Sequence, residues 1–205
     1  MVYKFTLEKT DIEVLAFLIK NNDKEYSIKE ISEKLKKTYV KVHNSIRRLS
    51  NNKVLQIKVM GKSHYCSIDF KNNLDVVCFV NSLMAKSFLD KNKKIKIIIS
   101  NIQESIKLPD YTLLIFGSYA KGSESKTSDL DLAVITSKEN KEKIERAINS
   151  VKRLAPLELH PLEFTYDEFK GMLVAKENNV GKEIIKNSII FSGCEQYYNC
   201  LELSK

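Results

Sequence analysis

Two aspartates, Asp129 and Asp131, are the residues whose type and spacing most clearly could do chemistry. They stand at the start of the apolar run 130–135, which predicts a buried β-strand. Residues two apart on a strand point to the same side, so both carboxylates face one way. Because convergent carboxylates repel each other, a fold seldom places them together without a cation. Oxygen ligands favour Mg²⁺ or Mn²⁺, so the pair predicts a site for one of these metals.

A glycine-containing turn stands upstream of the aspartate pair. The short apolar run 113–116 predicts another buried strand, and Gly117 and Ser118 follow it directly. Such a turn leaves backbone N–H groups free, and glycine lets a phosphate approach the backbone closely. Lys121 either adds a charge contact to the phosphate or points into water. The residues expected to bind a polyphosphate are Gly117, Ser118, Lys121 and Gly122.

The order and spacing of these residues resemble the signature of the DNA polymerase β-like nucleotidyltransferase superfamily. The spacer between turn and carboxylates is 119–128, and Leu130 and Leu132 fill the apolar positions. The resemblance implies that Asp129 and Asp131 hold metal ions and an NTP, whose terminal phosphates lie on the turn. A glycine loop beside an exposed aspartate pair is the alternative, and it explains a lone pair better than the whole signature.

Members of this superfamily usually carry a third carboxylate on a later strand, often as the general base for the acceptor hydroxyl. In this chain the corresponding strand is 157–165, and it contains no aspartate. Glu163 is one candidate for the third catalytic carboxylate, and Glu158 or His160 are the others. Glu158 and Glu163 fall on opposite faces by strand parity, and Pro161 disturbs the pattern. Two functions therefore stay open, transfer of a nucleotide and binding without transfer.

Positive charge is concentrated in the N-terminal third of the chain. Residues 1–71 contain fifteen Lys and Arg against eight Asp and Glu, whereas the remainder contains nineteen against eighteen. The net charge of the first part is +7 and that of the remainder +1. A Lys-rich surface in an AT-rich genome would explain abundant lysine but not this asymmetry. The asymmetry indicates an anionic partner such as nucleic acid.

Three short amphipathic helices and a hairpin are expected in this basic region, 1–72. Capping-box patterns begin the first two helices at Thr10 and Ser27, and the third helix spans 39–51. A hairpin follows with its turn at 60–63, so the region resembles a winged helix-turn-helix domain. Dimerisation or domain packing is the alternative use of such a fold. The resemblance implies outward, DNA-contacting residues on the third helix and the wing tip: Lys41, His43, Asn44, Ser45, Arg47, Arg48 and Lys62.

The predicted fold class is α+β with two domains. The winged helix-turn-helix domain is 1–72, linking helices occupy 73–108, and the nucleotidyltransferase domain is 109–205, a mixed sheet flanked by helices. No stretch approaches the roughly 20 apolar residues of a membrane span. The four cysteines are scattered without a CxxC pair, which is typical of reduced thiols. We therefore expect a cytoplasmic protein that does not bind membranes.

The leading functional expectation is a metal-dependent nucleotidyltransferase that moves an NMP from an NTP, such as ATP, to an unidentified acceptor. A partner protein is one acceptor, because stand-alone members resemble the antitoxin half of nucleotidyltransferase-type toxin–antitoxin pairs. The alternative is a DNA-binding transcriptional regulator whose nucleotidyltransferase domain senses nucleotide or is inactive. The expected partners are an NTP, DNA and a protein acceptor. A homodimer is also expected, because winged helices that read DNA commonly pair.

Overall fold

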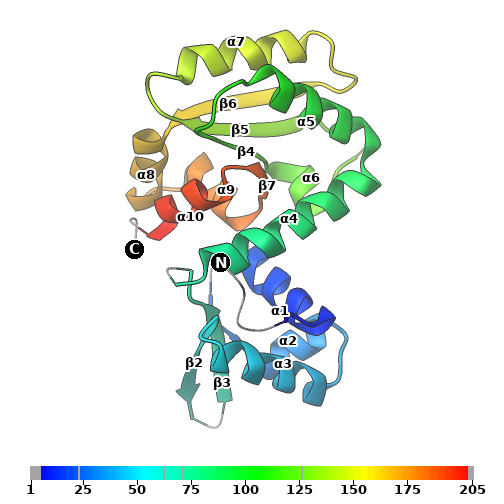
Figure 1. Cartoon of the computed structure of the whole chain (residues 1–205), viewed down its shortest axis with the longest axis vertical. Coiled ribbons are helices and arrows are strands. Elements are labelled where there is room, and N and C mark those ends of the chain that lie inside the picture. The colour runs from blue at the N-terminus through cyan, green and yellow to red at the C-terminus, as the bar shows by residue number, and fades with distance from the viewer. Residues whose placement is uncertain (1–5, 23, 62, 71, 126, 203–205) are drawn as a thin grey trace. The chain divides into compact units, whose positions relative to one another are not determined.

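The computed structural model describes residues 6–22, 24–61, 63–70, 72–125 and 127–202 (Figure 1). The chain divides into two compact units, unit 1 (Met1–Val80) and unit 2 (Asn81–Lys205). The division falls inside helix α4 (Leu74–Lys91), later than the domain end expected from the sequence. None of the helices in the described part of the chain combines the length and apolar character needed to cross a membrane.

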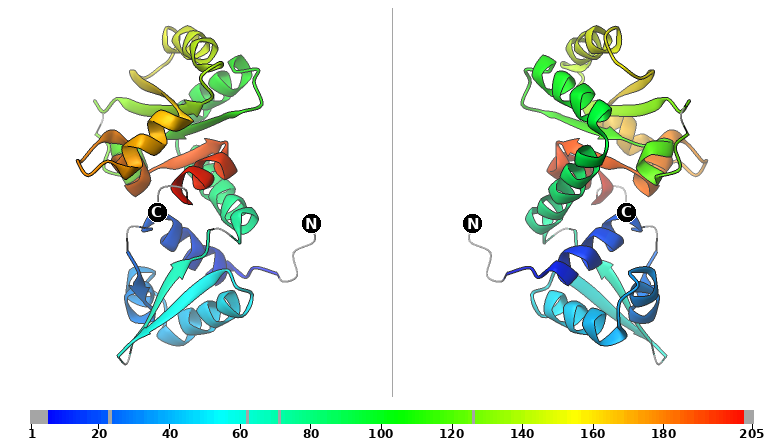
Figure 2. Two further views of the ribbon diagram at one scale, coloured as in Figure 1. Left: turned by 90° about the vertical axis from the view of Figure 1, so that its left-hand side faces the viewer. Right: turned by 90° about the vertical axis from the view of Figure 1, so that its right-hand side faces the viewer.

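Unit 1 combines helices with a small antiparallel sheet whose strand order is β1-β3-β2. Strands β2 and β3 form a hairpin that runs alongside α3 (Figure 2). Helix α3 turns its apolar side, Val42, Ile46 and Leu49, into the core of the unit. The elements, in chain order, are α1 (Lys9–Lys20), β1 (Tyr26–Ser27), α2 (Ile28–Lys34), α3 (Tyr39–Asn51), β2 (Leu55–Met60) and β3 (Ser63–Ile68).

Capping boxes begin α1 and α2, but only one lies where the sequence predicts it. Ser27 caps α2, accepting from the N–H of Glu30 at 3.2 Å and donating its own N–H to the Glu30 carboxylate at 2.8 Å. The predicted box at Thr10 is wrong. Helix α1 is capped instead by Glu8, whose N–H donates to Asp11 at 2.9 Å. Asp11 therefore lies at the start of α1, where a carboxylate also matches the helix dipole.

Unit 2 is built on a four-stranded mixed sheet with the order β6-β5-β4-β7. Strand β5 pairs in parallel with β6 and antiparallel with β4, which pairs antiparallel with β7. The mixed sheet flanked by helices confirms the predicted α+β class. Its elements are α5 (Lys93–Ser105), β4 (Tyr111–Ile115), α6 (Gly117–Lys121), β5 (Leu130–Thr136), α7 (Lys141–Lys152), β6 (Leu159–Thr165), α8 (Tyr166–Val174), α9 (Val180–Lys186), β7 (Ile189–Ser192) and α10 (Cys194–Glu202).

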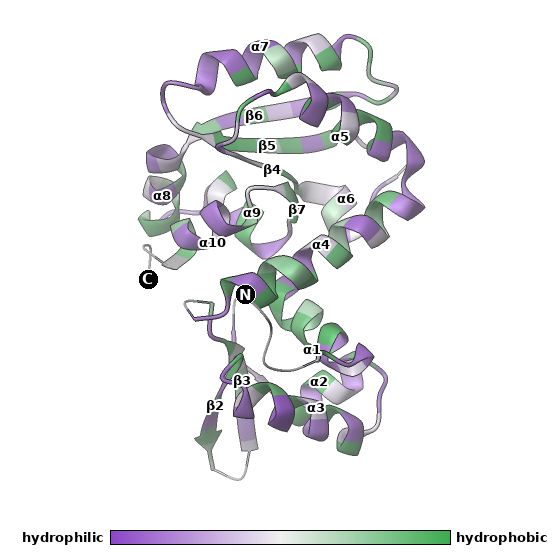
Figure 3. Ribbon diagram, viewed as in Figure 1, coloured by the Kyte–Doolittle hydropathy of each residue, from purple (hydrophilic) through white to green (hydrophobic). Residues whose placement is uncertain are grey.

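Helices cover the two faces of this sheet, α5 and α7 on one and α8 to α10 on the other (Figure 1). The core under α5 and α7 includes Leu130, Leu132 and Val134, alternate residues of β5. Strands β4 and β5 are largely apolar, as the sandwiched position requires (Figure 3). Helix α5 was expected to link the domains, but four of its isoleucines, Ile95, Ile98, Ile99 and Ile102, belong to this core. Asp131, Ala133 and Ile135 alternate with the three β5 residues of this core, so they face the other side of the sheet.

Candidate active site

The turn after β4 lies directly beside the start of β5. Ile115 pairs with Leu132, and the N–H of Phe116 donates to the carbonyl oxygen of Asp131 at 3.1 Å. Gly117 has φ +70°, and a Cβ there would overlap the Oδ2 atom of Asp131 and lie 3.0 Å from its Cγ. Any side chain at Gly117 would therefore displace the carboxylate and strain the backbone. The sheet register thus brings together the turn and the carboxylate that the sequence predicted as one site.

The neighbouring strand adds two side chains to the aspartate pair. His160 on β6 is the register partner of Asp131 on β5, and Glu158 precedes β6. The Nε2 atom of His160 lies 3.6 Å from Oδ2 of Asp129 and 3.8 Å from Oε1 of Glu158. One ligand atom from each of Asp129, Glu158 and His160 lies within 4.8 Å of the other two. We call Asp129, Asp131, Glu158 and His160 the carboxylate–imidazole cluster.

Burial and neighbouring charges shift the pKa of Asp131. Burial raises the pKa of Asp131 above its usual range, and the charges of Glu183 and Asp129 raise it further, while His160 and Lys121 act in the opposite direction. Of these, Lys121 is already paired, because its Nζ lies 2.9 Å from Oε1 of Glu183 on α9. The side chain of Asp129 is 39% exposed and that of His160 50%, so the cluster is open to solvent. A carboxylate-rich, accessible cluster of this kind fits a divalent cation.

The remaining predicted phosphate-binding residues surround the turn. Gly122, with φ +72°, ends the short helix α6 in the left-handed conformation, and nothing lies within 4 Å of a Cβ placed there. Ser118 is half-buried and Lys121 is exposed. In this arrangement Lys121 binds Glu183, so a phosphate group would have to compete with that carboxylate for it. Sequence reasoning missed Glu183, which lies 62 residues from Lys121 and carries no local signal.

Glu163 does not join the carboxylate–imidazole cluster. Its register partner on β5 is Val134, which belongs to the core under α5 and α7. Burial raises the pKa of Glu163, and the next contribution comes from Glu145 on α7. Strand parity therefore places Glu163 on the face opposite Asp131. Of the three sequence-based candidates for the third catalytic group, the structure brings Glu158 and His160 to the aspartates.

The comparisons with known proteins concern this part of the chain. Residues 95–190 match the family model of a nucleotidyltransferase domain. No curated protein and no solved structure gave a significant match. The matched range contains the turn, both aspartates and the strand of His160, so it includes the carboxylate–imidazole cluster. The match confirms the predicted nucleotidyltransferase domain over residues 95–190.

In unit 1, several residues predicted to bind nucleic acid lie together on α3. A shallow pocket of about 200 Å³ lies between this helix and the β2–β3 hairpin, and its lining includes His43, Arg47, Ile57 and His64. Lys62 falls outside the described residues. Four of the predicted residues are exposed: Lys41, His43, Asn44 and Arg47.

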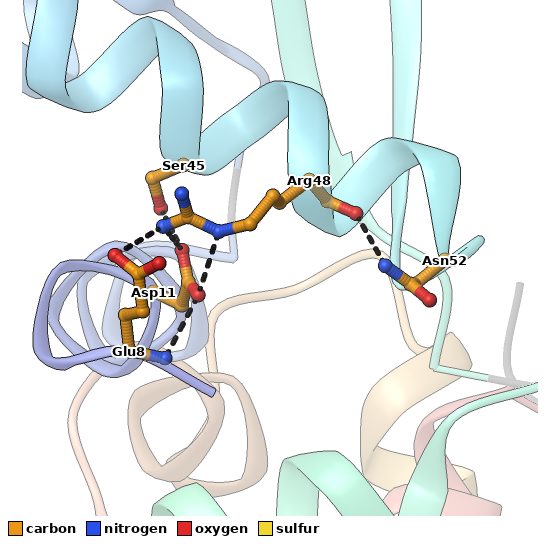
Figure 4. Close-up of polar contacts among 5 residues, drawn as sticks. All are labelled: Glu8, Asp11, Ser45, Arg48 and Asn52. Atoms are coloured by element: carbon orange, nitrogen blue, oxygen red, sulfur yellow. Dashed lines mark hydrogen bonds and ion pairs between the residues drawn. The ribbon is translucent and has the colours of Figure 1, made fainter. Parts of the chain in front are cut away.

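Two further residues of α3 do not face outward as the sequence predicted (Figure 4). Ser45 is fully buried and donates its hydroxyl to Oδ1 of Asp11 at 2.6 Å. Arg48 reaches the same fully buried carboxylate at 2.8 Å and also contacts Glu8 at 2.9 Å. Both side chains are drawn inward because Asp11 carries a buried charge that needs partners. The prediction that Ser45 points outward is therefore wrong, and Arg48, whose side chain is 37% exposed, is held by Asp11 and Glu8.

Proposed function

We propose that the chain is a metal-dependent nucleotidyltransferase that moves a nucleoside monophosphate from an NTP to an acceptor. The observation that carries the proposal is the close approach of Gly117 to the Asp131 carboxylate, with Asp129 acting on the same site. The turn at Gly117, which suits phosphates, follows β4, and the carboxylates, which suit a metal, stand at the start of β5. The two lie side by side although they belong to different strands. The match of this range to a nucleotidyltransferase family model supports the same reaction class.

In the proposed reaction, each residue has a separate task. The carboxylates of Asp129 and Asp131 would hold Mg²⁺ or Mn²⁺, because carboxylate oxygens are the ligands these ions prefer. The bound metal would stabilise negative charge on the attacking and leaving oxygens of an in-line displacement. Backbone N–H groups at Gly117 and the Ser118 hydroxyl would hold the terminal phosphates. Lys121 would leave Glu183 and contact the same phosphates.

The displacement forms one bond and breaks one. An acceptor hydroxyl oxygen bonds to the α-phosphorus of the NTP, and the bond from that phosphorus to the bridging oxygen breaks. Pyrophosphate leaves, and the hydroxyl proton passes to a base, for which Glu158 is an accessible carboxylate in the cluster. A partner protein is the acceptor we propose, because the carboxylate–imidazole cluster is open to solvent and a macromolecule could reach it.

For unit 1 we propose a winged helix-turn-helix fold that binds DNA. Its order of helices and strands, with a hairpin after α3, supports this. The net charge of +7 in residues 1–71 would attract phosphates. The exposed residues of α3 supply groups that contact phosphates or base edges. They are Lys41, His43, Asn44 and Arg47.

A second candidate function is a DNA-binding regulator whose unit 2 binds nucleotide without transferring it. The observation that favours it is the absence of a carboxylate opposite Asp131 among the described residues of β6. His160 occupies that position, and Glu163 faces the other side of the sheet. A site with only two strand carboxylates could still bind nucleotide and metal but transfer the nucleotide slowly or not at all.

A label-transfer experiment separates the two functions. The full chain is incubated with α-labelled ATP, CTP, GTP or UTP, with Mg²⁺ or Mn²⁺, and with a lysate of the host. The Asp129→Ala/Asp131→Ala double variant is run beside it, and Glu163→Gln is the matched control that removes a carboxylate from the other face. Label on one macromolecule, lost in the double variant and kept in the control, would support the transferase. Nucleotide binding without transfer would give the regulator the lead.

A further inference from the structure

His160 is the one member of the carboxylate–imidazole cluster that is not a carboxylate. It is the register partner of Asp131, so it stands where the neighbouring strand offers its side chain to the site. Its Nε2 atom lies 3.6 Å from a carboxylate oxygen of Asp129 and 3.8 Å from one of Glu158. The other candidate ligand on β6, Glu163, lies on the opposite face of the sheet.

These distances are too long for hydrogen bonds, which place a nitrogen about 2.7–3.2 Å from an oxygen. The imidazole therefore stands between two carboxylates without being bonded closely to either. Ligand atoms that share one cation at about 2.0–2.2 Å lie about 3 Å apart. Small rotations of these exposed side chains would bring Asp129, Glu158 and His160 to that spacing.

We propose that His160 is a metal ligand of the nucleotidyltransferase site, and that its nitrogen makes the site select Mn²⁺ over Mg²⁺. The inference rests on the proposed function, since it concerns the same metal. Carboxylate oxygens accept both ions, but imidazole is a better ligand for transition metals than for Mg²⁺. Mg²⁺ keeps its water and prefers oxygen.

Metal binding can be measured without any transfer reaction. The full chain, freed of metal by EDTA and dialysis, is titrated separately with Mn²⁺ and Mg²⁺ by calorimetry. We expect Mn²⁺ to bind about tenfold more tightly than Mg²⁺. Pulsed electron paramagnetic resonance of the Mn²⁺ complex should show modulation from a coordinated ¹⁴N nucleus, which a purely carboxylate site would not give.

Substitutions at His160 test whether that nitrogen is the ligand. His160→Asp restores an all-oxygen set, so we expect the ratio of Mn²⁺ to Mg²⁺ affinity to fall about tenfold and the ¹⁴N modulation to vanish. His160→Ala should also lose the modulation. The chain has two other histidines, His43 and His64, so His43→Ala and His64→Ala are the controls that must keep it. Glu163→Gln should leave both affinities unchanged.

The possible failures are distinguishable. Wild-type Mn²⁺ complex without ¹⁴N modulation, modulation that persists in His160→Ala, or an unchanged metal preference in His160→Asp would each overturn the inference. In those cases label transfer in the earlier experiment would still support the nucleotidyltransferase. Conversely, a nitrogen-ligated Mn²⁺ site in a chain that transfers no label would uphold the ligand assignment and overturn the proposed function.

Discussion

Asp11 in unit 1 and Asp131 in unit 2 are two aspartates that differ in burial and in hydrogen bonding. Asp11 is fully buried, and it accepts hydrogen bonds from Ser45, from Arg48 and from the backbone of Glu8. Asp131 is only partly buried, and its carboxylate accepts no hydrogen bond from the residues that the structure describes. A carboxylate whose charge the protein matches completely holds the fold together. In our proposal, the carboxylate of Asp131, which lacks such partners, is available to a ligand.

The strongest way to break this comparison is Asp11→Ala. It leaves the buried Ser45 hydroxyl without its partner and Arg48 with Glu8 alone, so we expect unit 1 to lose about 3 kcal/mol of unfolding free energy. Chemical denaturation followed by circular dichroism measures the loss. Glu33→Ala is the matched control, because Glu33 forms an exposed pair with Lys29 and should cost about 0.5 kcal/mol or less. Equal losses in the two variants would contradict the structural role of Asp11.

In the absence of metal, Asp131→Asn should raise the free energy of unfolding, whereas Asp11→Ala lowers it. Burial is the main reason that the ionised carboxylate of Asp131 is disfavoured, and it outweighs the opposing charges of His160 and Lys121, so a neutral amide removes a cost. We expect metal-free unit 2 to gain up to about 1 kcal/mol of stability, while label transfer is lost. Differential scanning calorimetry of both proteins in EDTA checks the gain. A loss of stability comparable to that of Asp11→Ala would show that Asp131 is structural after all.

Neighbouring arginines on α3 sharpen the comparison within unit 1. Arg47 is exposed, so Arg47→Ala should leave folding unchanged, weaken duplex binding several-fold and reduce the salt slope of binding by about one. Arg48→Ala should instead reduce stability, because it removes a partner of buried Asp11. Fluorescence anisotropy with duplex DNA at several salt concentrations measures the slope. The reverse assignment of the two effects would refute the orientation of α3 described above.

The smallest effect is expected at Glu163, a carboxylate outside both networks. Its pKa in the folded protein is raised by burial and by Glu145, so its protonated form favours folding. This stabilisation is complete below the unfolded pKa and is lost as the pH rises through the folded pKa. Glu163→Gln should therefore raise stability above that range by about 0.5 kcal/mol or less. Thermal unfolding between pH 4 and pH 8 tests it; a variant that is less stable at pH 8 would argue against this environment.

The parts of the molecule that depend on local pattern could be predicted from the sequence. The apolar run after Leu113 and the run that contains Asp131 became β4 and β5, because alternation and turn residues act over a few positions. The two carboxylates and the Gly117 turn were also recognisable, since their spacing is fixed along the chain. Short helix α6 was expected only as a turn, because five residues carry too little periodicity to reveal a helix.

The parts that depend on pairing between distant segments could not be predicted. Parity separated Glu158 from Glu163, but only the register of β6 on β5 shows which of them shares a face with Asp131. Ser45 was expected to point outward because its buried partner, Asp11, lies 34 residues away in another helix. In each case the deciding contact is tertiary, and residue types alone do not encode it.

The close approach of Gly117 and Asp131 also couples the substitutions that the two positions can accept in evolution. A lineage that kept the aspartate could accept an alanine at position 117 only if the carboxylate moved, because the new methyl group would overlap it. Once the aspartate were lost, only the backbone cost of φ +70° would oppose the change, about 1–2 kcal/mol. The two codons should therefore drift in a fixed order, the aspartate first and the glycine afterwards. Wherever the aspartate is retained, we therefore expect a glycine at 117 as well.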